Sequence, residues 1–430
     1  MIDRYCTPEM SGIWSRQAKY ERWKQVEIAI CKAHCEAGTL PAAALNTIEA
    51  NAAFSLERCD EIEKETRHDL MAFVRNLSEN IGPDGRWVHF GVTSYDVIDT
   101  ALGMMLRDSC DQLIARATDL REVIAKLAKE QINTPMIGRT HGIHAEPITF
   151  GFKLAGWHAE VARSIERLKA CRNEIAVGKV SGAVGVHAIT SPELEKRVCE
   201  MLGLAPDEAS TQIVSRDRMS NLFGVLATFA ASMERFATEL RNLQRTEILE
   251  IQEQFASGQT GSSAMPHKRN PWNSETVCGL ARIVRTNALA ILESQATWHE
   301  RDLSNSSVER IVLPDTFQLM DFMALKLSTI LSGIHVMGEN MSANLKKMGD
   351  LVFSEHVMIA LIGKGLSREA AYKVAQRNAA KAWEGQDFKT CVSQDEDVKS
   401  NLTSAEIEEC FSLEHHLRHV EHSLRAAGIF

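Results

Sequence analysis

The sequence predicts an all-α protein with three helical domains. Apolar residues recur at helical spacing through most of the chain. Several of these patterns exceed the usual length of a globular helix, about 8–20 residues, which indicates a long-helix bundle of a kind that subunits can share. Segments with the period-two pattern of strands are nearly absent. The nearest candidate, the glycine-rich stretch 178–189, is interpreted as a loop or a short hairpin.

The first expected domain covers residues 1–93. Ser11 is a candidate cap for its first helix, and Gly38 would end that helix near Ala37. Helices are expected over 11–37, 42–51 and 55–80. The run Gly-Pro-Asp-Gly at 82–85 then marks a strong break.

The second expected domain, 94–344, carries the long-helix bundle, and the third covers 345–430. The longest pattern begins at Ser94, and Pro135 must end it because proline cannot continue a helix. Long helices are expected over 94–132, 148–175, 217–256, 273–298 and 315–343. The third domain should contain shorter helices that Gly363 and Gly365 interrupt, with a polar loop at 387–401.

Composition excludes several classes of protein. The formal net charge of -9 argues against broad nucleic-acid binding, which needs a basic face. No apolar run is long enough to span a membrane, and the N-terminus lacks a secretory signal. The ten cysteines are scattered singly without a CxxC pair, so reduced thiols and a cytoplasmic location are expected.

The loop 258–271 carries the richest chemistry in the sequence. Its two glycines and two prolines forbid a continuous helix between two strongly helical patterns. Between them stand adjacent serines, an amide and three basic side chains, which a plain linker does not need. Such a loop can hold a carboxylate or phosphate, or a cation in it can help Ser262 to act as a base. These residues alone leave the anion-binding and catalytic interpretations equally open.

The same loop resembles the signature of the fumarase/aspartase superfamily. Its residues 261–271 read GSSAMPHKRNP, and the MPHKRNP form is most similar to the branch that cleaves succinylated purine nucleotides. The resemblance extends to the segments IDRY at 2–5, Arg67-His68-Asp69, HFGVTSYDVIDT at 89–100, GRTHGIHAEP at 138–147 and ERDLSNSSVER at 300–310. It implies an all-α homotetramer with a twenty-helix core, in which each active site combines segments from three subunits. No cofactor is implied.

The resemblance also implies a reaction, the β-elimination of fumarate from adenylosuccinate (giving AMP) and from SAICAR (giving AICAR). Ser262 matches the family base, and Lys268 and Asn270 are suited to stabilising the carboxylate on which charge develops. His141 matches the acid that protonates the departing nitrogen, and Glu275 matches its carboxylate partner. One position departs from many relatives: Ile143 replaces a glutamine, which could alter a hydrogen bond near the acid.

The nucleotide-binding residues follow from the same matches. His68 is expected near the phosphate or the leaving group, and His89 near the phosphate. Two arginines suit a phosphate because the guanidinium donates forked hydrogen bonds. The remaining expected substrate contacts are Arg4, Tyr5, Arg67, Asp69, Thr93, Ser94, Gln212, Ser263, Arg301, Ser306 and Arg310.

Other functions fit less well. Another superfamily lyase, such as argininosuccinate lyase, aspartase or fumarase, would not need so many basic and hydroxyl residues placed to bind a phosphate. A related cycloisomerase or a non-catalytic helical scaffold would not need the Ser262, His141 and Lys268 set. The spacing of His415, His416 and His419 resembles a metal site, but it is interpreted as an exposed terminal helix, and no metal is expected.

Overall fold

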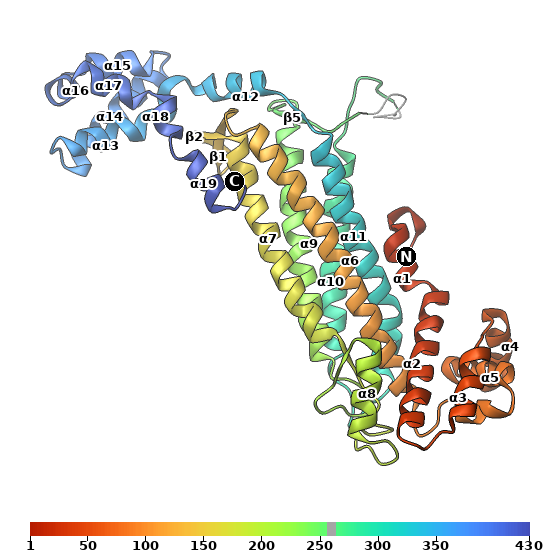
Figure 1. Ribbon diagram of the computed structural model, residues 1–430. Helices are drawn as coiled ribbons and strands as arrows, with labels where there is room; N and C mark the ends of the chain where they lie inside the picture. Colours follow the sequence, from red (N-terminus) through yellow and green to blue (C-terminus); the bar gives the residue numbers. More distant parts are fainter. Residues whose placement is uncertain (256–263) are drawn as a thin grey trace. The chain divides into compact units, whose positions relative to one another are not determined.

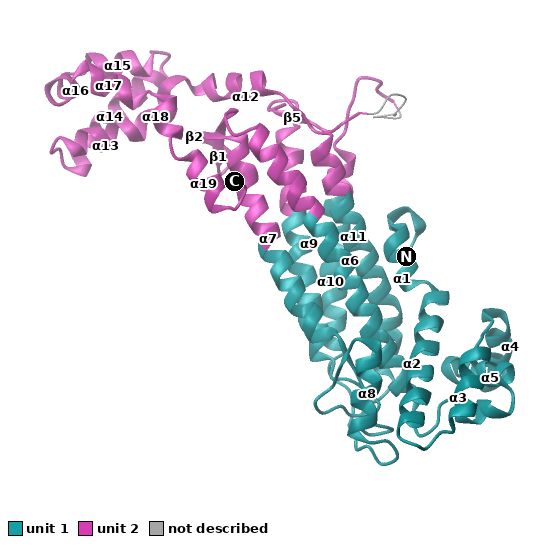
Figure 2. Cartoon of the chain, viewed as in Figure 1, with its two compact units in different colours: residues 1–118, 163–234, 277–325 teal, residues 119–162, 235–276, 326–430 magenta. Residues whose placement is uncertain are grey.

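The computed structural model describes residues 1–255 and 264–430, and helices dominate it, so the all-α prediction is confirmed (Figure 1). Strands among the described residues form only three two-stranded pairings. The chain divides into two compact units (Figure 2): unit 1 contains 1–118, 163–234 and 277–325, and unit 2 contains 119–162, 235–276 and 326–430. The three-domain division with boundaries near 93 and 345 stays a prediction.

The N-terminal part is a set of short helices that begin at side-chain caps. Thr7 accepts the N–H of Met10 at the start of the first helix, and Ser15 accepts that of Ala18 at the start of the second. The elements are η1 Asp3–Tyr5, α1 Pro8–Trp14, α2 Arg16–Glu36, α3 Ala42–Asn51, α4 Leu56–Thr66, α5 Asp69–Ile81 and η2 Pro83–Trp87.

Five long helices follow, and each contributes residues to both units. They are α6 Ser94–Glu130, α7 Phe150–Ile175, α9 Asp217–Leu243, α10 Trp272–Glu293 and α11 Ser304–Ser332. The shorter elements between them are β1 Pro135–Thr140, β2 Ile143–Thr149, β3 Val177–Gly178, α8 Pro192–Leu202, β4 Ala205–Pro206 and β5 Ile251–Gln252. No described helix has the length and apolar character that crossing a membrane requires.

Unit 1 is held together by aromatic packing and by buried ion pairs. The rings of Tyr20 and Trp23 of α2 pack at a tilt of 31°, with centroids 4.6 Å apart, in one apolar core. Arg216, just before α9, bridges the carboxylates of Asp99 on α6 and Glu309 on α11 with N–O distances of 2.6 and 2.8 Å. All three side chains are buried, so this network fixes the relative register of α6, α9 and α11 within the unit.

Unit 2 joins a β-hairpin to the C-terminal helices. Strands β1 and β2 pair antiparallel, with Pro135 opposite Thr149 and Thr140 opposite Ile143. Ile137 of this hairpin packs with Phe353 in a small apolar cluster. The C-terminal elements are β6 His335–Val336, α12 Gly338–Leu345, η3 Lys346–Phe353, α13 Ser354–Gly363, α14 Arg368–Trp383, α15 Phe388–Gln394, α16 Glu396–Asn401, α17 Ser404–Cys410, α18 Leu413–Leu417 and α19 Val420–Ala426.

Several expected elements differ in the structure because side chains interrupt the helical pattern. The helix expected over 11–37 begins earlier, at Pro8, and is broken at Ser15, whose extended backbone lets it cap α2. The helix expected over 55–80 is two helices, because Arg67 adopts a left-handed conformation between α4 and α5. Polar caps therefore decide these boundaries, although the apolar periodicity runs across them.

Three further expectations need correction, and one element is additional. The helix expected over 217–256 ends at Leu243. The single helix expected over 315–343 is two helices, α11, which already starts at Ser304, and α12. The loop expected over 387–401 forms α15 and α16, because Asp387 and Asp395 cap short helices there. The hairpin at 135–149 was not expected at all. By contrast, the prediction over 94–132 is confirmed to within two residues, and residues 179–189 form a loop as expected.

Candidate active site

The junction of α4 and α5 in unit 1 places the first group of expected residues. Arg67 closes α4 with φ of 50°. His68 then caps α5, because its Nδ1 accepts the N–H of Met71 at 3.5 Å. The opposite ring nitrogen, Nε2, lies 3.3 Å from the hydroxyl of Ser94 at the first residue of α6. The helix cap thus orients His68 toward Ser94, which the sequence placed 26 residues away.

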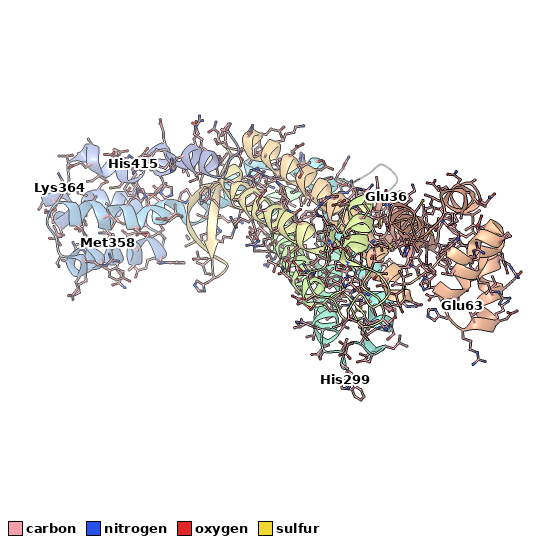
Figure 3. All side chains as sticks on the ribbon, turned by 60° about the horizontal axis from the view of Figure 1, so that its bottom comes forward. Glu36, Glu63, His299, Met358, Lys364 and His415 are labelled. Atoms are coloured by element: carbon pink, nitrogen blue, oxygen red, sulfur yellow. The ribbon has the colours of Figure 1, made fainter. Side chains whose placement is uncertain are left out.

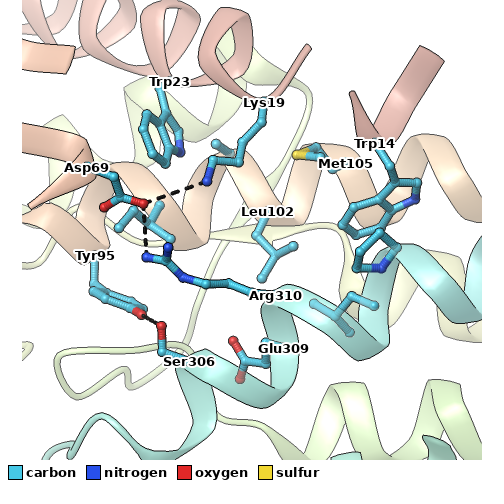
Figure 4. A pocket seen from close by; sticks show the side chains of 14 residues that line it. Trp14, Lys19, Trp23, Asp69, Tyr95, Leu102, Met105, Ser306, Glu309 and Arg310 are labelled. Atoms are coloured by element: carbon cyan, nitrogen blue, oxygen red, sulfur yellow. Dashed lines mark hydrogen bonds and ion pairs between the residues drawn. The ribbon is translucent and has the colours of Figure 1, made fainter. Parts of the chain in front are cut away.

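Asp69 is the most buried acidic group at this junction, and two cations face it (Figure 4). Its Oδ2 lies 2.9 Å from Nη2 of Arg310 and 3.7 Å from Nζ of Lys19. Burial alone would raise the pKa of Asp69, but Lys19, Arg310 and the N–H of Leu70 outweigh burial and hold it below its ordinary value. The carboxylate is therefore ionised and positions both cations.

A cavity of about 340 Å³ opens beside these groups in unit 1. Trp14, Trp23 and Leu102 form apolar parts of its wall, while Asp69 and Arg310 supply charge (Figure 4). Burial lowers the pKa of Lys19, another lining residue. An apolar wall with a few oriented polar groups is the usual character of a small-molecule site.

Arg301 has hydrogen-bonding capacity that the described residues do not use. Its guanidinium stacks on the ring of Tyr95 at 3.5 Å, and its Nη1 donates to Oε1 of Gln212 at 3.0 Å. Its Nε and Nη2 are buried and have no hydrogen-bond partner among the described residues. Tyr95 in turn donates to the hydroxyl of Ser306 at 3.2 Å. A held guanidinium with unused donors is suited to an anionic ligand, since buried donors without partners are costly.

His89 is held by a buried carboxylate rather than standing free. It adopts φ of 63°, its backbone N–H donates to Glu27 at 2.8 Å, and its Nδ1 lies 2.7 Å from the same carboxylate. Burial lowers the pKa of His89, but Glu27 more than offsets this and raises it overall. No sequence signal separates Glu27 from the many exposed glutamates of the chain, so sequence reasoning missed it.

The start of α6 is also fixed by internal contacts. The N–H of Thr93 donates to Asp96 Oδ2 at 2.7 Å, and Asp96 forms a fully buried ion pair with Lys179. Thr93 and Ser94 are both partly exposed at this helix start. Of the two N-terminal expected residues, Arg4 is exposed in η1, and Tyr5 packs edge-on against Phe322 at 5.4 Å.

In unit 2, the β1–β2 hairpin presents His141 at its tip. His141 and Gly142 form the two-residue turn with φ of 54° and 77°, the signs of a type I′ turn. His141 is exposed, and the neighbouring Ile143 is 68% exposed. Arg139 anchors the strand by pairing with the buried Glu250 at 2.7 Å. His141, the expected general acid, therefore lies on the turn of a hairpin that the sequence analysis did not predict, and the ion pair of Arg139 holds the adjoining strand in place.

The part of the signature loop that the structure describes, from Ala264 on, lines a second cavity of about 820 Å³ in unit 2. Cations outnumber acids in its lining, which includes Arg241, Arg245, Lys268 and Arg269 together with His267, Asn270 and Glu275. Buried Glu253 fixes the loop's exit by accepting the N–H of Ser274 at 2.9 Å in the first turn of α10. A basic cavity of this size suits a polyanionic ligand.

Two expected residues, Ser262 and Ser263, lie outside the described residues. Glu275 is exposed in the first turn of α10, and no hydrogen bond or ion pair joins it to His141 among the described residues. Unit 1 thus brings together His68 with Ser94, Asp69 with Arg310, and Gln212 with Arg301, and it places Ser306 against Tyr95. Sequence reasoning missed Lys19 and Tyr95, although Tyr95 directly follows an expected residue.

Comparison with known proteins identifies the family of this chain. A family model described as lyase matches residues 4–285, and one described as adenylosuccinate lyase C-terminus matches 350–427. An adenylosuccinate lyase of Synechocystis sp. is 49% identical over 97% of each chain, and that of Bacillus subtilis is 45% identical over 100% of each. The chain belongs to the adenylosuccinate lyase family.

The solved structures support the fold of this family. A crystal structure of a fumarate lyase from Mesorhizobium sp. BNC1 covers 99% of each chain with a TM-score of 0.90 at 24% identity. At that identity the likeness establishes the helical architecture only. The match over 4–285 includes residues of both units, and the match over 350–427 lies in unit 2.

Proposed function

We propose that this lyase eliminates fumarate from adenylosuccinate, leaving AMP, and from SAICAR, leaving AICAR. The observation that carries the proposal is the full-length identity of 45% and 49% to proteins named adenylosuccinate lyase. The intact signature at 261–271 and the cation-rich cavity beside it support the same activity. The basic and hydroxyl side chains of unit 1 that are suited to binding a phosphate favour a nucleotide substrate over a simple succinylated amine.

In the proposed first step, the Ser262 alkoxide removes a proton from the carbon beside one carboxylate of the succinyl group. The electron pair moves into that carboxylate, which becomes a dianionic aci-carboxylate. Lys268 supplies positive charge and Asn270 a hydrogen bond to this developing charge, as electrostatic stabilisation of the transition state requires. Both residues follow Ser262 within the same loop, and Lys268 lines the cavity of unit 2.

In the second step, the carbon–nitrogen bond breaks and a double bond forms between the two carbons of the succinyl group. The electron pair of the broken bond goes to the leaving nitrogen, to which His141 gives a proton. We assign Glu275 as the partner that fixes the tautomer of His141. Support comes from the exposure of His141 on its hairpin turn, where its ring can meet a ligand or another chain.

The nucleotide end is assigned to unit 1. The unpaired donors of Arg301, the hydroxyl of Ser306 and the charge of Arg310 are suited to phosphate and ribose oxygens. We place His68 with Ser94 at the phosphate or the leaving nitrogen. The further proposed substrate contacts are Arg4, Tyr5, Arg67, Asp69, His89, Thr93, Gln212 and Ser263.

We also propose a homotetramer in which each active site takes segments from three subunits. The long helices of unit 1 support it, because apolar side chains on them remain exposed: Ile283, Leu289 and Leu292 on α10 and Ile311 on α11 are 46%, 58%, 55% and 65% exposed. Exposed apolar surface of this kind marks association. All ten cysteines are free, which supports the proposed cytoplasmic location.

A direct assay tests the activity. Purified protein is mixed with adenylosuccinate, and ultraviolet absorbance follows the loss of the succinylated purine while fumarate is measured separately. We expect stoichiometric AMP and fumarate. Turnover of argininosuccinate with an inert adenylosuccinate would instead assign the chain to another branch of the superfamily.

A further inference from the structure

We propose that Glu146, His356 and His416 form a binding site for one divalent transition-metal ion of the zinc class. The three residues come from β2, α13 and α18, all in unit 2. Their candidate ligand atoms all lie within 4.8 Å of one another. Two imidazoles with one carboxylate are a common ligand set for zinc and its neighbours. This site is separate from every residue to which a role in the elimination is assigned.

A backbone hydrogen bond already orients the imidazole of His416 for binding. Nε2 of His416 lies 2.9 Å from the carbonyl oxygen of Pro147, an acceptor only, so this nitrogen carries the proton in the neutral ring. The lone pair is then on Nδ1, which points at Nε2 of His356 across 2.8 Å. A backbone carbonyl that fixes the far nitrogen of a ligating histidine is the usual support of a metal site.

The cluster is close to the geometry that a tetrahedral ion needs. With zinc–nitrogen bonds of about 2.0–2.1 Å, two nitrogens of a tetrahedron lie about 3.3 Å apart. The present separation of 2.8 Å therefore has to widen by only about 0.5 Å. Side-chain rotation can provide this, because His356, His416 and Glu146 are all partly exposed rather than locked in the core.

Electrostatics favour a cation at this place. Two carboxyl groups, those of Glu146 and Glu355, line the cavity that contains the cluster. A cation would relieve the repulsion between these two acids, and Glu355 or water can fill the fourth position. Two cations, Lys364 and Arg418, line the same cavity, but both are exposed to solvent, and Lys364 is paired with Glu406 at 2.6 Å.

The neighbouring histidines differ from the ligand set, so the sequence spacing alone pointed to the wrong residues. His415 (labelled in Figure 3) is engaged with Glu409, its Nδ1 lying 3.0 Å from that carboxylate. His419 lines the cavity but does not belong to the cluster. His416 is half-buried rather than part of a fully exposed helix, which corrects the expectation for this segment.

A bound metal ion would cross-link three elements of unit 2. It would connect β2 of the hairpin that ends in the His141 turn to two C-terminal helices, α13 and α18, that lie more than 200 residues further along the chain. The apolar ring of Phe353 flanks both imidazoles, with ring centroids 6.2 and 6.3 Å away, and shields the site on one side. The expected consequence is greater stability of the full-length protein, independent of turnover.

The test uses the full-length protein, stripped with a chelator and then titrated with Zn²⁺ or Co²⁺. We expect one tight equivalent per chain by calorimetry and a rise in the thermal unfolding midpoint that saturates at that equivalent. The Co²⁺ spectrum should show nitrogen and oxygen ligation without a thiolate charge-transfer band. Absence of a stoichiometric site, or a thiolate band from the free cysteines, would overturn the proposal.

Matched variants locate the site. His356→Gln, His416→Gln and Glu146→Gln should each weaken binding by more than about tenfold. His419→Gln, in the same cavity, should bind as the original protein does. Equal binding by all four variants would refute the assignment. Because a ligand variant could fold poorly, anomalous diffraction from crystals of the unaltered protein with Zn²⁺ provides a second measurement, and a peak away from the three residues would count against the site.

Discussion

Nη2 of Arg310 on α11 lies 2.9 Å from Oδ2 of Asp69, which occupies the first turn of α5. Lys19 on α2 approaches the same oxygen at 3.7 Å. A single carboxylate therefore positions two cations at the wall of the unit 1 cavity, where the nucleotide is proposed to bind. The position of Arg310 depends on a residue that is 241 positions earlier in the chain.

Asp69→Asn should remove the negative charge that positions Arg310 and Lys19. We expect a loss of about 1–3 kcal/mol in the free energy of unfolding, since the two cations lose a largely buried partner. The KM for adenylosuccinate should also rise, because Arg310 is no longer held. Denaturant unfolding and steady-state kinetics measure the two effects. Asp60→Asn removes the exposed partner of Arg16 and should cost less than about 1 kcal/mol; equal losses in both variants would contradict the role of Asp69.

Arg301→Lys should weaken nucleotide binding with little change in stability. Lysine keeps the charge but loses the planar stacking on Tyr95 and the forked donors. We expect KM for adenylosuccinate to increase by about tenfold or more, equivalent to about 1.4 kcal/mol. Inhibition by inorganic phosphate should weaken in parallel. Arg75→Lys, at an exposed ion pair with Glu65, is the matched control and should leave both constants unchanged.

Ser262→Ala and His141→Ala should each lower kcat by about 10²–10⁴-fold, the usual contribution of a proton-transfer group. His335→Gln, an exposed histidine of β6, serves as the control for the histidine change. If subunits share active sites, dissociating and reassembling a mixture of the two inactive variants should restore part of the activity. Near-normal turnover in either single variant would reject its assigned role.

His89 should make stability depend on pH. Its folded-state pKa is raised above the unfolded value, so the protonated ring favours the folded state through Glu27. This contribution is complete below about pH 6.5 and is lost as pH rises through the folded-state pKa. Thermal melts from acid to alkaline pH should therefore show a smaller decline for His89→Asn than for the original protein. Asparagine tolerates the positive φ at this position.

Gly142→Ala tests whether the turn presents His141. The hairpin needs φ of 77° at this glycine, and the left-handed region costs an alanine about 1–2 kcal/mol. A methyl group would meet no atom within 4 Å at either Gly142 or Gly363, but only Gly142 has positive φ. We expect reduced stability and reduced kcat for Gly142→Ala only. Equal behaviour of the two variants would show that turn geometry is unimportant.

The helical class and the long helices were predictable because they depend on local periodicity. Residues 94–132 show this best, since one apolar stripe continues without caps and α6 follows it to Glu130. Breaks were harder to predict where a polar side chain competes with the pattern, as at Ser15 and Arg67. The short helices at 388–401 were missed for the same reason. Aspartate is common in loops, and only the structure shows that Asp387 and Asp395 cap the N-termini of α15 and α16.

The sequence by itself was sufficient to predict the fold class, the family and the types of side chain needed for elimination. The fold class follows from local apolar periodicity, and the family and the side chains follow from one continuous signature. Only the tertiary structure decided which groups meet. Glu27 with His89, Asp69 with Arg310, and His356 with His416 are each joined across at least 60 residues. Such contacts depend on how helices pack and cap one another, and no spacing along the chain encodes that distance.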